Sequence, residues 1–218
     1  MDKKELQNPA LYTNRELSWL LFNKRVLSEA RDKQLLLFER LKFLSITASN
    51  LDEFFMVRIG SLVDMIHAEY TKKDIAGMSA KEQLDALMEE THKFAALQYS
   101  TYNRMLLPQL RANGLNFVEH HEQLTERQAQ YVDEYFEENV YPVLTPMAVD
   151  SSRPFPLIRN KTLNIGALVA KKGEKDTEIE FATVQVPSVL PRVVRIPAAK
   201  EGDTEVAVLL LEEIIERN

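Results

Sequence analysis

The spacing of apolar residues differs between the two parts of this chain, which we divide near residue 113. Before that point apolar side chains recur every three to four residues, which is the period of a helix that buries one face. Beyond residue 156 three stretches alternate between apolar and polar residues, as strands with one buried face do. The chain is therefore predicted to be α+β. An all-helical domain is expected over 1–113, and part of a mixed α/β domain with an antiparallel sheet over 114–218.

Helix starts in both halves are marked by a hydroxyl residue followed three positions later by Glu or Gln. In such a capping box the two side chains satisfy free backbone N–H groups at the helix N-terminus. The boxes lie at Thr13–Glu16, Ser79–Glu82 and Thr125–Gln128. Two further helical runs are expected at about 35–47 and 51–70, separated by Ala48-Ser49-Asn50.

The second half carries the signals of strands. These are TLNIGALVA (162–170), EIEFATVQV (178–186) and RVVRIP (192–197), with KKGEKD (171–176) as a candidate hairpin turn. The final EVAVLLLEEIIERN predicts a strand that runs into a helix. Its apolar residues Leu209, Leu210, Ile214 and Ile215 are followed by no element that could cover them, so the chain is expected to be a piece of a longer protein.

Composition narrows the function classes. With 45% apolar residues the chain can form a core, which argues against disorder. The net charge is -6, and residues 114–218 hold 18 Asp and Glu against 11 Lys and Arg, so nucleic-acid binding is not expected. There is no cysteine, and no stretch approaches the ~18 apolar residues of a membrane span. The polar N-terminus shows no secretory signal, and a cytoplasmic location without a transmembrane segment is predicted.

Familiar catalytic motifs are missing from the sequence. It has no glycine-rich phosphate loop, no dinucleotide-binding glycine motif and no serine elbow. The histidines His67, His92, His120 and His121 lack the helical i, i+4 partner of a zinc pair, and the adjacent pair His120-His121 is expected to be solvent exposed. No catalytic residue and no metal ligand is therefore predicted.

Two polar residues interrupt the predicted apolar faces. A buried polar group left without a partner costs ~1–3 kcal/mol, so each must have one. Asn23 is expected to form a hydrogen bond between helices. Arg58 is expected to pair with Glu16, Glu39 or Asp52, with a phosphate contact as the alternative.

Asn50 stands at the expected joint between two helices. Asparagine is among the favoured N-cap residues, and the acids Asp52 and Glu53 would suit a first helical turn. A side-chain amide also offers donors and an acceptor, which suits the edge of a purine base. Both interpretations, a helix cap and a ligand contact, follow from the residues.

Three blocks of sequence carry a resemblance to a known family. They are NRELSWLLFNKRVLSEA (14–30), ERLKFLSITASNLDEFFMVRIGSL (39–62) and YPVLTPMAVDSSRPFPLIRNKTLNI (141–165). Together they resemble the N-terminal part of the long bacterial polyphosphate kinases, the type 1 family. The resemblance implies a helical N-terminal domain over 1–113, and the first part of a head domain that takes part in dimer contacts over 114–218.

The resemblance also implies a function. The family transfers the terminal phosphate of ATP reversibly to inorganic polyphosphate through a phosphohistidine. Its asparagine that contacts the ATP base matches Asn50, whereas its phosphorylated histidine and Mg²⁺-binding arginines belong to domains outside this chain. The implied partners are ATP or ADP, polyphosphate and a second copy of the protein, with peripheral membrane association of the full-length enzyme as one option. The chain alone is expected to be inactive. A non-catalytic helical self-association module is the alternative.

Overall fold

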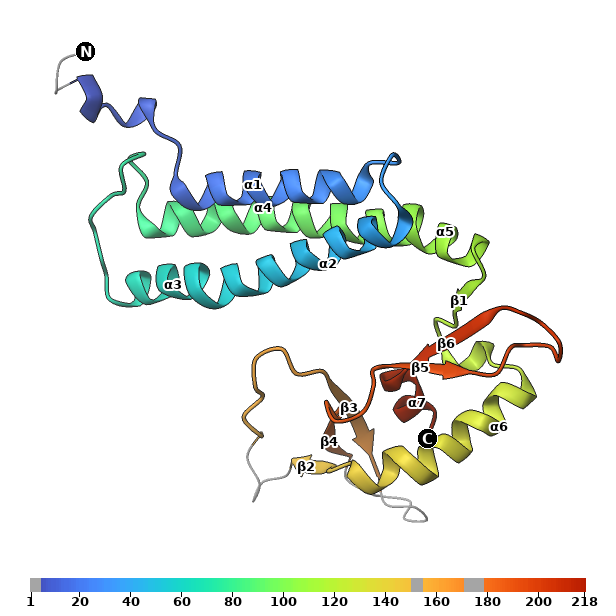
Figure 1. Ribbon diagram of the computed structural model, residues 1–218. Coiled ribbons are helices and arrows are strands. Elements are labelled where there is room, and N and C mark those ends of the chain that lie inside the picture. Colours follow the sequence, from blue (N-terminus) through green and yellow to red (C-terminus); the bar gives the residue numbers. More distant parts are fainter. Residues whose placement is uncertain (1–4, 150–154, 171–178) are drawn as a thin grey trace. The chain divides into compact units, whose positions relative to one another are not determined.

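The computed structural model describes residues 5–149, 155–170 and 179–218. The chain divides into two compact units, Met1–Leu110 and Arg111–Asn218, and each is described by itself. Figure 1 shows helices throughout the first unit and both strands and helices in the second. The α+β class predicted from the sequence is confirmed.

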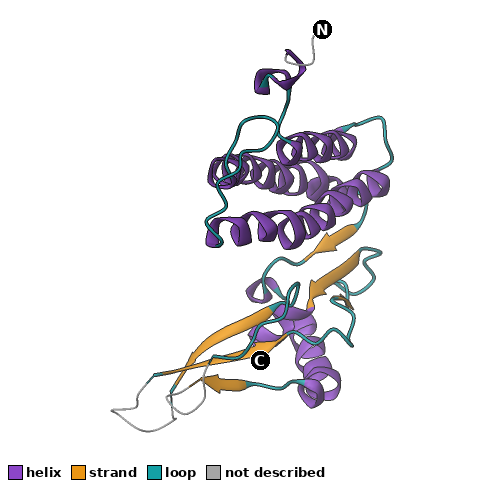
Figure 2. Ribbon diagram, turned by 90° about the vertical axis from the view of Figure 1, so that its left-hand side faces the viewer, coloured by secondary structure: helices purple, strands orange, loops and turns teal. Residues whose placement is uncertain are grey.

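The first unit is a bundle of long helices that lie side by side (Figures 1 and 2). Its N-terminal residues form two short 3-10 turns before the first helix. The helices are α1 (Arg15–Arg31), α2 (Leu37–Phe54), α3 (Gly60–His67), α4 (Ala80–Thr101) and α5 (Leu107–Ala112). The capping box predicted at Ser79–Glu82 is present at the start of α4.

The predicted break at Ala48-Ser49-Asn50 does not occur. Helix α2 passes through these residues and continues by a π-helical turn, Phe55–Ile59, into α3. No proline or glycine lies between residues 37 and 59, so nothing in the backbone forces the helix to end there. Asn50 is thus an interior residue of α2, and its interpretation as a helix cap is wrong.

The first helix also starts one residue later than predicted. The N-cap of α1 is Asn14, whose Oδ1 accepts from the backbone N–H groups of Glu16 and Leu17 at 3.0 and 2.9 Å. Thr13, the predicted cap, is exposed. Asparagine and threonine can both cap, and tertiary contacts of the asparagine amide, described below, favour Asn14.

Helix α4 runs into α5 through a second π-helical turn, Tyr102–Leu106, just before Pro108. Because proline has no N–H to donate, an irregular turn is favoured at this point. None of the helices within the described residues combines the length and the apolar character that crossing a membrane requires.

The core of the first unit consists of two clusters of buried side chains. One joins Leu20, Phe54, Ile59, Leu62, Ala80 and Leu87, and the other joins Leu27, Ala30 and Phe94. Beside the first cluster the rings of Trp19 and Phe54 stack with centroids 4.4 Å apart. This packing fixes α1 against α2 close to Asn50.

Within its described residues the second unit holds two three-stranded sheets. Its elements are β1 (Leu115–Phe117), α6 (Glu126–Tyr135), β2 (Met147–Val149), β3 (Asn164–Val169), β4 (Glu180–Gln185), β5 (Val193–Ile196), β6 (Val206–Leu210) and α7 (Leu211–Arg217). One sheet has the order β1-β6-β5, with β1 parallel and β5 antiparallel to β6. The other has the order β2-β4-β3 and is antiparallel throughout.

The three predicted strands and the predicted capping box of α6 are confirmed. The candidate turn KKGEKD lies outside the described residues. The final apolar residues are covered, contrary to expectation. Leu209, Ile214 and Ile215 are buried in a core that includes Val132 and Val140. The covering elements, α6 and the turn that follows it, precede these residues in the sequence.

Candidate functional site

The side chain of Asn50 takes part in a polar chain that crosses the helices of the first unit. Its Nδ2 donates to Asn23 Oδ1 at 3.0 Å. Asn23 is fully buried, and its Nδ2 donates to the backbone carbonyl of Thr47 at 3.1 Å. The Thr47 hydroxyl in turn accepts from Gln98 Nε2 at 2.9 Å. The predicted interhelical hydrogen bond of Asn23 is confirmed.

This chain fixes which way the Asn50 amide faces. The carbonyl of Thr47 can only accept, so Asn23 must turn its NH₂ group toward it and its Oδ1 toward Asn50. Asn50 must then donate to Asn23. Its Oδ1 and second N–H form no hydrogen bond with any described residue. They are therefore available to a ligand.

Asn50 lines a hollow of about 250 Å³, here called the Asn50 hollow. The lining residues are Trp19, Asn50, Glu53, Phe54, Val57 and Arg58. It thus combines aromatic and aliphatic surface with one amide and two opposite charges. A flat apolar group that carries donor and acceptor atoms on its edge suits such a lining.

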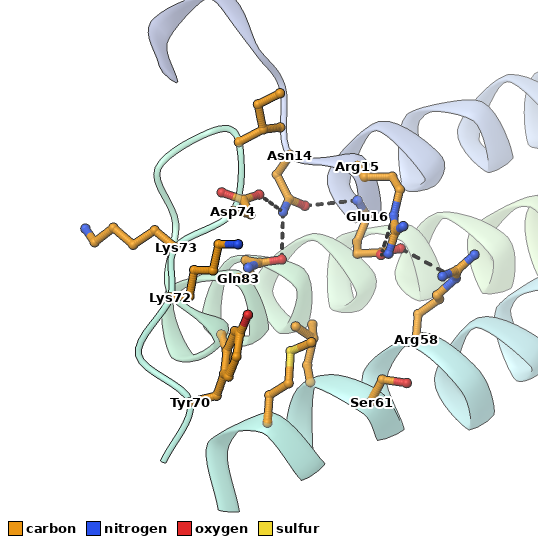
Figure 3. A pocket seen from close by; sticks show the side chains of 14 residues that line it. Asn14, Arg15, Glu16, Arg58, Ser61, Tyr70, Lys72, Lys73, Asp74 and Gln83 are labelled. Atoms are coloured by element: carbon orange, nitrogen blue, oxygen red, sulfur yellow. Dashed lines mark hydrogen bonds and ion pairs between the residues drawn. The ribbon is translucent and has the colours of Figure 1, made fainter. Parts of the chain in front are cut away.

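Arg58 also lines a second, larger cavity of about 500 Å³ (Figure 3). Its Nε lies 3.9 Å from Oε2 of Glu16. Of the three predicted partners, Arg58 therefore pairs with Glu16 and not with Glu39 or Asp52. Arg58 is not buried, however: 48% of its side chain is exposed. The buried carboxylate of Glu16 also accepts from Arg15. Lys72 and Lys73 also line this cavity, although the Lys73 side chain points away from it (Figure 3).

Asn14 closes one end of this larger cavity. Besides capping α1, its Nδ2 donates to Asp74 at 2.7 Å and to Gln83 at 2.8 Å (Figure 3). One buried amide therefore connects the start of α1, the loop before α4 and α4 itself. This role cannot be predicted from sequence, because asparagine has the same cap preference whether or not such contacts exist.

Arg40 is a buried arginine that connects helices and that was not predicted from the sequence. Its side chain is 2% exposed, and Nε donates to the carbonyl of Ala30 at 3.0 Å. Nη1 donates to Gln109 at 3.0 Å, so the guanidinium joins α2 to the end of α1 and to α5. An arginine within a predicted apolar helix is the signal that could indicate such a residue.

The histidine pair is exposed only in part. His120 is exposed as predicted, but His121 is half-buried, and its ring lies beside Glu213 of α7. The fold of the second unit brings the two together from far apart in the sequence. Periodicity within one segment could not indicate this contact.

Comparison with known proteins identifies the family. A model described as the polyphosphate kinase N-terminal domain matches residues 12–118. A second, described as the polyphosphate kinase middle domain, matches residues 127–218. The chain belongs to the polyphosphate kinase family. The resemblance noted in the three sequence blocks is thereby confirmed.

Individual polyphosphate kinases show the same relation. That of Lactiplantibacillus plantarum is 51% identical over 204 residues, which are 94% of this chain and 27% of the relative. That of Halalkalibacterium halodurans is 45% identical over 212 residues, which are 97% of this chain and 29% of the relative. The chain therefore spans less than a third of the length of these curated polyphosphate kinases.

A solved structure shows the same fold. The crystal structure of polyphosphate kinase from Porphyromonas gingivalis matches with a TM-score of 0.80 at 30% identity. The match covers 94% of this chain and 30% of the other. Both units thus have counterparts in a polyphosphate kinase.

Proposed function

We propose that this chain is the nucleotide-orienting part of a kinase that moves the terminal phosphate of ATP to inorganic polyphosphate and runs in reverse to make ATP. The reacting groups, including the phosphohistidine and the arginines that hold Mg²⁺, belong to domains outside it. Phosphoryl transfer depends mainly on positioning and on stabilising charge, so a part that only orients ATP has a defined share in it. The chain alone is inactive in this proposal.

The observation that carries the proposal is the fixed amide of Asn50. Its remaining acceptor and donor have no partner among the described residues, and Asn50 lines the Asn50 hollow together with Trp19 and Phe54. An asparagine amide can pair with the edge of adenine by one donated and one accepted hydrogen bond. Since Asn23 and Thr47 hold the amide in one orientation, the site favours adenine over a base with the reversed donor and acceptor pattern.

The charges around the hollow support an anionic ligand. Arg58 belongs to both cavities, and Arg15, Lys72 and Lys73 lie on the larger one. Phosphates attached to a base in the Asn50 hollow would therefore meet net positive charge nearby.

The Mg²⁺ that accompanies ATP does not fit this hollow. Magnesium prefers several oxygen ligands in octahedral geometry, and the hollow offers one carboxylate, Glu53, close to Arg58. No step of the reaction is assigned to residues of this chain, and the ion's ligands are expected elsewhere. Association of two copies stays a prediction from the family resemblance.

Steady-state kinetics of the full-length protein test the proposal. Asn50→Ala should raise the KM for ATP at least several-fold while kcat changes little, because a base contact acts in the bound ground state and the transition state alike. Asn103→Ala, which removes an exposed asparagine of the same unit, is the matched control and should leave both constants unchanged. An unchanged KM together with a lower melting temperature for Asn50→Ala would mean that the residue is structural only.

A further inference from the structure

A group of metal-ligating side chains lies in the second unit, outside the site described above. It consists of His121, in the 3-10 turn His121–Gln123, and of Glu213 and Glu216 in α7. One ligand atom from each residue lies within 4.8 Å of the others. Within the described parts of the chain, no other group of three or more such residues meets this spacing.

The ring nitrogen of His121 that faces this group lacks a hydrogen bond. Nδ1 is buried and has no partner among the described residues, although Glu213 Oε2 lies 3.4 Å away. A buried polar atom without a partner costs free energy, commonly ~1–3 kcal/mol. A cation bound to the Nδ1 lone pair removes that cost.

The surroundings orient these side chains for a cation. The other ring nitrogen, Nε2, lies 3.6 Å from Glu122 Oε1, so a proton on Nε2 faces a carboxylate. That tautomer leaves the Nδ1 lone pair free, as in metal sites where a carboxylate supports the liganding histidine. The backbone N–H of His121 donates to Glu213 Oε2 at 3.0 Å and holds this carboxylate in place.

We propose that His121, Glu213 and Glu216 bind a divalent transition-metal ion of the Zn²⁺ type. Imidazole nitrogen with carboxylate oxygen suits Zn²⁺ better than Mg²⁺, which prefers oxygen alone. Two atoms bound to one tetrahedral ion at ~2.0–2.2 Å lie about 3.4 Å apart, so the atoms of this group, which lie within 4.8 Å of one another, must close by up to about 1.4 Å. Rotation of Glu216, the exposed member, supplies this contraction.

The three carboxylates nearby give the site its charge. Glu122, Glu213 and Glu216 face two histidines, of which His120 Nδ1 lies 3.6 Å from Glu213 Oε1. His120 can supply a fourth ligand by rotation of its exposed side chain, and water can take the same position. Because the ligands come from the turn after β1 and from α7, the ion would fasten these two segments together.

Titration of Zn²⁺ into the metal-stripped chain by calorimetry tests this proposal. One equivalent should bind, the melting temperature should rise, and Co²⁺ in place of Zn²⁺ should give the visible absorption of a site with nitrogen and oxygen ligands. His121→Ala and Glu216→Gln should each abolish this binding. Glu122→Gln should weaken it about tenfold, as loss of a carboxylate beside a liganding histidine does.

His92→Ala is the matched control, since it removes a histidine on an exposed face of α4 and should leave Zn²⁺ binding unchanged. Glu216→Gln changes an exposed residue, and circular dichroism should show the fold of the parent. Absence of saturable Zn²⁺ binding would overturn the proposal, as would binding that survives both His121→Ala and Glu216→Gln. The site is independent of the nucleotide role, so neither result bears on Asn50.

Discussion

Asn50 Nδ2 donates to Oδ1 of the fully buried Asn23 at 3.0 Å, and this bond joins the proposed ligand contact to the core of the helical unit. The contact side chain is therefore held by a residue that the ligand does not reach. Because the side chain is already held in one orientation, less conformational entropy is lost when a ligand binds. The hydrogen bond also means that changes at Asn23 should alter both stability and nucleotide binding.

Asn23→Ala tests this coupling. It removes two hydrogen bonds and leaves a small cavity in the core, so the free energy of unfolding should fall by about 1–3 kcal/mol. Nucleotide affinity should fall as well, although Asn23 does not line the Asn50 hollow. Urea denaturation and ATP binding measure the two effects. Ser28→Ala, which changes an exposed residue of the same helix, is the control. Equal ATP affinity in the parent, the Asn23→Ala variant and the Ser28→Ala variant would contradict the coupling.

The cap of α1 gives a second prediction with a neighbouring control. Asn14→Ala should lower the free energy of unfolding by at least about 1–2 kcal/mol, because it removes the cap and the bonds to Asp74 and Gln83. Thr13→Ala should change it by no more than about 0.5 kcal/mol, as expected for an exposed residue. Equal losses for the two variants in urea denaturation would show that Asn14 is not the cap.

Arg40 should not tolerate lysine. A guanidinium can donate to Ala30 and Gln109 at once, whereas one ammonium group cannot reproduce this planar geometry. Arg40→Lys is expected to cost about 1–3 kcal/mol in chemical denaturation. Lys42→Ala removes an exposed cation of the same helix and should cost about 0.5 kcal/mol or less. A neutral Arg40→Lys would mean that the two hydrogen bonds contribute little.

The second unit should lose stability in acid through Asp133. Arg217 donates two hydrogen bonds to this carboxylate, at 2.7 and 2.9 Å, and thereby lowers its pKa. An acid whose pKa is lower in the folded state stabilises the fold above its unfolded pKa. That contribution disappears as the pH falls through the folded pKa. The stabilisation by this pair should therefore be complete at neutral pH and should decline progressively as the pH falls below about 4.

Melting curves of Asp133→Asn at pH 7 and pH 3 measure this effect. The variant should melt below the parent at pH 7, and the difference should shrink as the pH falls toward 3, because the parent carboxylate becomes protonated as the pH approaches its folded pKa. Asp203→Asn, an exposed aspartate of the same unit, should show no such pH dependence. A constant difference between Asp133→Asn and the parent at both pH values would contradict the assignment.

Local sequence signals predicted the elements but not all of their limits. The capping boxes at Ser79 and Thr125 and the alternating strands depend on neighbours in sequence, and the structure contains them. The break expected at Asn50 is absent. A residue that is favoured at helix caps can also lie inside a helix when a tertiary partner, here Asn23, satisfies its side chain. Such a partner lies far away in the sequence and leaves no periodic signal.

The candidate sites, too, could be predicted from the sequence only in part. Asn23 could be predicted to bond between helices because an amide on an apolar face needs a partner. The identity of that partner, and the orientation it imposes on Asn50, follow only from the packing of α1 on α2. His121 and Glu213 are separated by most of the second unit, so no spacing rule could join them. Arg58 is half exposed because it lies in the π-helical turn after α2 and lines two cavities.

The central claim, that Asn50 contacts the base of ATP, is tested most directly by base selectivity. Hypoxanthine carries the O6 acceptor where adenine carries the N6 donor, so it cannot donate a hydrogen bond to the Oδ1 of a fixed amide. The full-length protein should therefore use ATP with a kcat/KM at least about tenfold above that for ITP, since such a pair contributes about 1–3 kcal/mol. Asn50→Ala should remove most of this preference. An ATP-to-ITP ratio that Asn50→Ala leaves unchanged would contradict the account.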